Sequence, residues 1–96
     1  MPFFQPSKEH PIVIDYNRYD PICVLSYTTT EGEVTPLLFK CKNPDESIST
    51  VHINQITNRK ESIAILEFHC LCEYYGALKK VVLRFYKEYF IWDMAK

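Results

Sequence analysis

Apolar residues recur at every second position along the last third of the chain, from Ile63 to Met94. This spacing is typical of a β-strand with one buried face, and nothing in the segment has the period of a helix. It therefore predicts three consecutive antiparallel strands. Their apolar positions are Leu66, Phe68, Cys70 and Cys72, then Val81, Leu83 and Phe85, and finally Phe90, Trp92 and Met94.

The register of the first of these hairpins follows from matching apolar with apolar positions. With the loop at Tyr75–Gly76, Phe68 faces Leu83 on the apolar side, and Glu67 meets Arg84 on the other side. A slip of one residue would place Phe68 opposite Arg84 and send apolar side chains to water. The same rule predicts three pairs in the last hairpin: Phe85 with Phe90, Leu83 with Trp92, and Val81 with Met94.

Further strands are expected upstream, separated by turns. The prolines and glycines mark the breaks: Gly32 supplies the positive φ of a hairpin loop, and Pro36 places an edge or a bulge within its strand. Residues 57–62 are expected to form a polar connection. These patterns predict an all-β fold, an antiparallel meander of five to seven strands curled into a small SH3-like or partly open barrel. The expected upstream strands are Ile12–Tyr16, Ile22–Thr29, Val34–Lys42 and Ser47–Ile56.

The length of 96 residues fits one domain, which we expect at residues 12–96 behind an extended arm at residues 1–11. The strand Ile22–Thr29 is apolar on both faces, so its buried face stays open. The predicted core consists of Ile22 or Cys23, Val24 or Leu25, Phe39, Ile53, Leu66, Phe68, Cys70, Val81, Leu83, Phe85, Phe90 and Trp92.

The start of the chain lacks the basic and apolar regions of a signal peptide, and no apolar run approaches the ~18 residues of a membrane span. We therefore expect a cytoplasmic protein without a membrane partner. Its four cysteines are then expected to be thiols.

The C-terminal half has the spacing F-x-C-x5-G-x6-L-x8-W, formed by Phe68, Cys70, Gly76, Leu83 and Trp92. Upstream of it lies an alternating V-x-I-x-x-I segment that is closed by Arg-Lys-Glu. Residues 51–94 thereby resemble a group of small bacterial all-β proteins that are often encoded on mobile elements. The resemblance implies one compact β domain and a bacterial mobile-element setting, and it brings no activity, ligand or catalytic residue.

The pair Cys70-x-Cys72 invites a metal-site reading, which would need two further ligands such as Cys23, Cys41, His52 or His69. Because both thiols are in phase with Leu66 and Phe68, we interpret them as small buried core residues. No nucleophile elbow, phosphate loop or supported carboxylate pair is present. We therefore predict a protein that is not an enzyme and has no catalytic residue, cofactor, metal or small-molecule ligand.

The remaining hypothesis is a protein-interaction or assembly module that binds a protein partner or forms a homo-oligomer. Seven tyrosines, the Phe3-Phe4 pair of the arm and an apolar strip beside a basic residue favour it. The alternative is single-stranded nucleic-acid binding by a basic and aromatic sheet face, although the net charge of −1 disfavours it. Both hypotheses use the same candidate surface, made of Lys80, Val82, Arg84, Tyr86 and Ile91.

Overall fold

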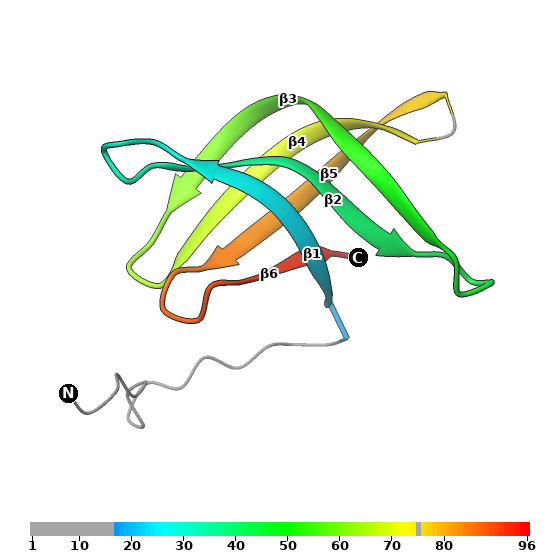
Figure 1. Ribbon diagram of the computed structural model, residues 1–96, viewed down its shortest axis with the longest axis horizontal. Helices are drawn as coiled ribbons and strands as arrows, with labels where there is room; N and C mark the ends of the chain where they lie inside the picture. Colours follow the sequence, from blue (N-terminus) through cyan, green and yellow to red (C-terminus); the bar gives the residue numbers. More distant parts are fainter. Residues whose placement is uncertain (1–16, 75) are drawn as a thin grey trace.

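Six antiparallel strands, each paired with the next along the chain, close into a small β-barrel (Figure 1). The computed structural model describes residues 17–74 and 76–96, so the predicted arm and the predicted strand Ile12–Tyr16 lie outside the described residues. The all-β meander predicted from the alternating pattern is confirmed. The strands are β1 (Tyr19–Thr28), β2 (Val34–Lys42), β3 (Ile48–Glu61), β4 (Ile65–Tyr74), β5 (Ala77–Tyr86) and β6 (Ile91–Ala95).

Strand β1 closes the barrel by changing its neighbour halfway along. Its first part pairs with β6 from Tyr19 to Ile22, and its second part pairs with β2 from Cys23 to Thr28. In Figure 1, β1 leaves β6 near the C-terminus and crosses the front of the molecule toward β2. The barrel is therefore closed by two partial ladders.

The predicted register of β4 and β5 is confirmed along the whole hairpin. Phe68 lies opposite Leu83, and Glu67 lies opposite Arg84. Gly76 adopts a φ of 80° at the hairpin tip, and Gly32 adopts a φ of 88° between β1 and β2. Such positive φ values cost glycine little free energy. Matching of apolar faces was enough to specify this hairpin.

The predicted register of β5 and β6 is wrong by two residues. Phe85 pairs with Trp92 and Leu83 with Met94, because the loop contains four residues, Lys87 to Phe90. The last of them, Phe90, adopts a φ of 55° and donates its backbone N–H to the carbonyl of Tyr86 over 2.9 Å. Phe90 is therefore 77% exposed, and its place in the predicted core is wrong.

Strand β3 is longer than the sequence pattern indicates, because two bulges interrupt its alternation. The pairing with β4 skips one residue at Asn54 and another at Thr57. A bulge adds one unpaired residue, so Ile53 and Ile56 pack against the same core although three positions separate them. The segment 57–62, expected as a connection, is strand as far as Glu61.

Strand β2 contains the irregularity that its proline predicted. The pairing with β1 steps from Leu38 to Pro36, which leaves Leu37 as the extra residue of a bulge. The ring of Pro36 is fully buried, and the side chain of Leu37 is 43% exposed. Proline lacks the N–H that a regular ladder needs, so the bulge accommodates it.

The core consists of the inward side chains of β2 to β6 around a stack of three aromatic rings. Trp92 lies 4.9 Å from Phe85 and 5.8 Å from Phe68 between ring centroids. Ile22 and Val24 pack against this core, which settles the open question of which face of β1 is buried. The fully assembled core cluster is Phe39, Val51, Leu66, Phe68, Cys70, Cys72, Leu83, Phe85 and Trp92.

We expect Phe68→Ala to lower the free energy of unfolding by about 3–5 kcal/mol, because it opens a cavity beneath Trp92. Phe90→Ala, the matched aromatic control, should change it by no more than about 0.5 kcal/mol, since that ring is exposed. Urea denaturation followed by tryptophan fluorescence measures both values. Equal losses for the two variants would contradict the observed register of β6.

Candidate functional site

The predicted interaction surface, made of Lys80, Val82, Arg84, Tyr86 and Ile91, does not form a continuous exposed surface. Lys80 and Ile91 are exposed, and Val82 is half-buried. Tyr86, expected to face solvent, is only 1% exposed, and the side chain of Arg84 is 14% exposed. The two side chains best suited to binding are thus engaged within the molecule.

Arg84 lies at the centre of a polar cluster that joins three strands on the outer side of the barrel. Its Nε and Nη2 donate to the two carboxylate oxygens of Asp93, each over 2.9 Å. The hydroxyl of Tyr86 donates to Oδ2 of Asp93 over 2.6 Å, and Arg84 also donates to that hydroxyl. The guanidinium lies 3.2 Å from the ring centroid of Tyr19 on β1. We call these four residues the Arg84 cluster.

Within the Arg84 cluster, the charges of Arg84 and Asp93 compensate each other. Asp93 has no exposed surface, and burial of a carboxylate is costly unless a cation and hydrogen bonds compensate it. The hydrogen bond from Arg84 to Asp93 raises the pKa of Arg84 further above its usual value. Burial, followed by the hydrogen bond to Asp93, raises the pKa of Tyr86 well above that of a free tyrosine. The cluster therefore acts as a structural tie and offers no free charge to a ligand.

The Arg84 cluster could not be predicted from the sequence, because the predicted register of β6 was wrong by two residues. That register placed Ile91 opposite Arg84, whereas Asp93 is the actual cross-strand partner. Glu67, expected to pair with Arg84, does lie opposite it, but its carboxylate contacts His69 Nε2 at 2.7 Å. The loop length of the last hairpin alone decided which acid neutralises the arginine.

The C-x-C thiols lie in the core, where they were expected. Cys70 and Cys72 are buried, and burial raises the pKa of Cys70 to about 12 and that of Cys72 to about 11. Within residues 17–74 and 76–96, no group of three His, Cys, Asp or Glu side chains is placed to hold a metal ion. The burial and raised pKa values of the two thiols fit the predicted role of small core residues.

Exposed apolar side chains gather along β1 instead. Because Ile22 and Val24 point inward, the alternating residues Cys23, Leu25 and Tyr27 point outward. Leu25 is 56% exposed and Tyr27 is 50% exposed. Leu37 and Leu38 of β2 flank them on one side, and Phe90 and Ile91 flank them on the other. We call this set of seven residues the β1 face.

The β1 face is uncharged over an unusual length of chain. Residues 21–30 contain no Asp, Glu, Lys or Arg, although these types make up 24% of the sequence. Five of the eight large hydrophobic side chains that are exposed in the described part of the chain belong to the β1 face. Exposed apolar clusters larger than those of a typical monomer are characteristic of binding surfaces. The lack of charge together with apolar residues on both sides of the strand is the sequence signal that could have indicated it.

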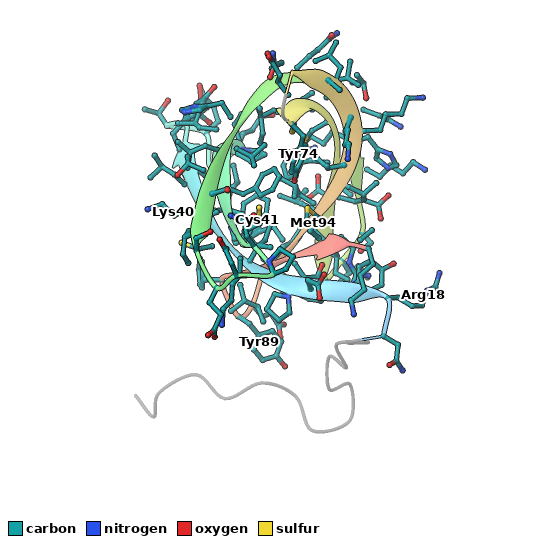
Figure 2. The ribbon with its side chains drawn as sticks, turned by 90° about the vertical axis from the view of Figure 1, so that its right-hand side faces the viewer. Arg18, Lys40, Cys41, Tyr74, Tyr89 and Met94 are labelled. Atoms are coloured by element: carbon teal, nitrogen blue, oxygen red, sulfur yellow. The ribbon has the colours of Figure 1, made fainter. Side chains whose placement is uncertain are left out.

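Two hollows border β1 where its partial ladders end. One, of about 380 Å³, is lined by residues 21–24 of β1 and by residues 90–92 of β6 and the preceding loop. The other, of about 800 Å³, lies between residues 20–23 of β1 and residues 40–42 of β2. Figure 2 looks toward this end of the barrel and shows Cys41 and Met94 within the ring of strands, with Lys40 outside it. Both hollows are open to solvent, and the larger one is lined by the charged side chains of Asp20, Lys40 and Lys42 as well as by apolar residues.

Removal of one member of the Arg84 cluster should be costly. We expect Asp93→Ala to lower the free energy of unfolding by about 3–5 kcal/mol, because it leaves the Arg84 guanidinium uncompensated. Replacement of both partners, in Arg84→Met with Asp93→Leu, should recover most of that loss. Urea denaturation of the wild type, the single variant and the double variant measures both effects, and a double variant as unstable as Asp93→Ala would contradict this role.

The thiols should separate into two reactivity classes. Iodoacetamide at mildly alkaline pH should modify the exposed Cys23 in the folded protein, whereas Cys70 and Cys72 should react only after denaturation. The reason is that burial blocks access and their raised pKa values leave almost no thiolate. Peptide mass spectrometry measures the sites. Modification of Cys70 in the folded protein at the rate of Cys23 would contradict the assigned burial.

No protein-family model, curated protein or solved structure matches the chain. The described residues contain no helix long and apolar enough to cross a membrane.

Proposed function

We propose that this protein is a non-enzymatic binding module that docks onto a protein surface through the β1 face. The single observation that carries the proposal is the exposure of Leu25, Tyr27, Leu37, Phe90 and Ile91 on and beside the uncharged residues 21–30. A bilayer or nucleic acid would favour several basic residues beside this strip, whereas residues 21–30 are neutral and the pairing with β2 places one lysine, Lys40, opposite Cys23. A neutral apolar strip suits a protein partner with the same character.

The side chains of the β1 face match those that carry binding energy in protein interfaces. Tyr27 and Phe90 present large rings that lose little conformational freedom on binding, and Tyr is enriched among hot-spot residues. Full burial of a side chain such as Leu25 or Phe90 is worth about 1.5–3 kcal/mol relative to water. Because these side chains are largely exposed in the isolated barrel, much of this free energy remains available for binding.

The nucleic-acid alternative loses two of its expected contacts to the Arg84 cluster. The guanidinium of Arg84 is already bound to Asp93, and the ring of Tyr86 is covered. A stacking platform for bases needs exposed rings beside free cations. Lys80 alone remains exposed from the basic and aromatic part of the predicted surface, and we therefore favour the protein partner.

The setting of this module stays a prediction. The resemblance of residues 51–94 to small bacterial proteins of mobile elements favours a bacterial origin. The sequence pattern at the start of the chain favours the cytoplasm. The absence of a catalytic constellation in the sequence favours a role in binding over catalysis.

Site-specific photocrosslinking tests this proposal. We expect benzoylphenylalanine at position 27 to yield higher-mass protein adducts on irradiation of the host cells, because that side chain would lie within the interface. The same group at Lys80, an exposed strand position of β5 outside the β1 face, is the matched control. Immunoblotting and mass spectrometry detect the adducts. A barrel that yields none from position 27, or equal amounts from both positions, would exclude docking by the β1 face.

A further inference from the structure

The part of β1 that leaves β6 has one open edge. Its pairing with β6 ends at Ile22, while its pairing with β2 runs from Cys23 to Thr28. In the described part of the chain, no strand pairs with the other edge of residues 23–28. Backbone N–H and C=O groups along such an edge are a template for another strand.

This open edge lacks the features that keep natural edges apart. Lysine, proline and inward charges are the usual protections, and residues 23–28 contain none of them. The bulge at Leu37 belongs to β2, so it distorts the paired edge of β1 and not the open one. An unprotected, uncharged edge of this kind is available for pairing with another strand.

We infer that the strand that covers this edge is β1 of a second copy of the same chain, paired antiparallel about a two-fold axis. This inference rests on the proposed function, since it names the partner of the β1 face. A symmetric interface brings each residue close to its own type or to a near neighbour, so charge on the strand would repel itself. The neutral composition of residues 21–30 is therefore the complementarity that a self-pairing strand requires.

Side-chain parity restricts the register of this pairing. Residues directly opposite in an antiparallel pair point to the same side of the sheet, so outward residues must face outward residues. With the axis at Leu25, the two Leu25 side chains meet, and each Cys23 lies opposite Tyr27 of the other copy. The inward residues Val24 and Ser26 then face each other as well. This register pairs residues 23–27 and brings the two exposed Leu25 side chains together.

The surroundings of the open edge fit an added strand. The hollow of about 380 Å³ lies between residues 21–24 and residues 90–92, on the side of β1 that faces away from β2. Phe90 borders this hollow and is 77% exposed, so its ring can cover the apolar side chains of an incoming strand. Its positive φ holds it outside the core, where it has only an edge contact with Phe85 at 6.0 Å between centroids.

Light scattering after size exclusion tests the oligomeric state of the full chain. We expect the mass to rise with concentration from 11.4 kDa to twice that value. Leu25→Lys should remain monomeric at every concentration, since it would place two ammonium groups on the axis. Lys80→Glu, which changes an exposed charge on β5, should dimerise like the wild type. Circular dichroism and the urea midpoint verify that Leu25→Lys still folds.

A disulfide trap tests the register independently of affinity. Opposed residues of an antiparallel pair have Cα atoms about 4.5–5.5 Å apart, within the range that a disulfide spans. In a Cys23→Ser background, Leu25→Cys should therefore form a covalent dimer on mild oxidation. Lys80→Cys in the same background should not.

The outcomes separate this inference from the proposed function. A dimer that persists in Leu25→Lys and is not trapped by Leu25→Cys would overturn β1 pairing. A monomer whose position 27 crosslinks to a different protein, or to residues 1–16 of its own chain, would overturn the second copy as partner. If position 27 crosslinks to a different protein, the β1 face would still be a protein-binding surface. A monomer with no intermolecular adduct at all would overturn both proposals.

Discussion

The sharing of β1 between two neighbours is the constraint on which the rest of this barrel depends. Four residue pairs with β6 and six with β2 are the whole backbone connection between the first strand and the rest of the sheet. The Arg84 cluster reinforces this junction, because Tyr19 of β1 packs on a guanidinium that is itself bound to Asp93 of β6. Backbone pairing and side-chain chemistry thus meet at the same place.

The inner and outer faces of the barrel wall have different roles. Inside, Phe68, Phe85 and Trp92 form an apolar core that would tolerate no charge. Outside, a buried ion pair joins β5 to β6 on one part of the wall, and the β1 face leaves another part apolar and exposed. An ion pair of this kind adds little net stability over apolar contacts of similar size, but it fixes which groups face each other. The open part of the wall is where binding energy remains available.

The sequence predicted those features that depend on alternation, and it failed where alternation is interrupted. The register of β4 and β5 followed from parity, because a tight turn at Gly76 left no freedom. The register of β6 did not, because Phe90 occupies a left-handed position that glycine usually takes, and no residue type marked the longer loop. The two bulges of β3 likewise shift its faces without a proline or glycine to indicate them. The β1 face includes Phe90 and Ile91, in and next to the loop whose length was predicted wrongly. Its residues could therefore be predicted only in part.

The pairing of Tyr19 with Ala95 has a consequence for the order in which the barrel assembles. These residues lie at opposite ends of the described chain, so this contact closes the largest loop in the fold and carries the highest entropic cost. The ladders from β2 to β5 join sequence neighbours and can form while later residues are still being synthesised. The seam between β1 and β6 has to wait until the last strand has left the ribosome. Until then β1 pairs with β2 alone. The whole length of its other edge is accessible to neighbouring chains that are being synthesised on the same mRNA.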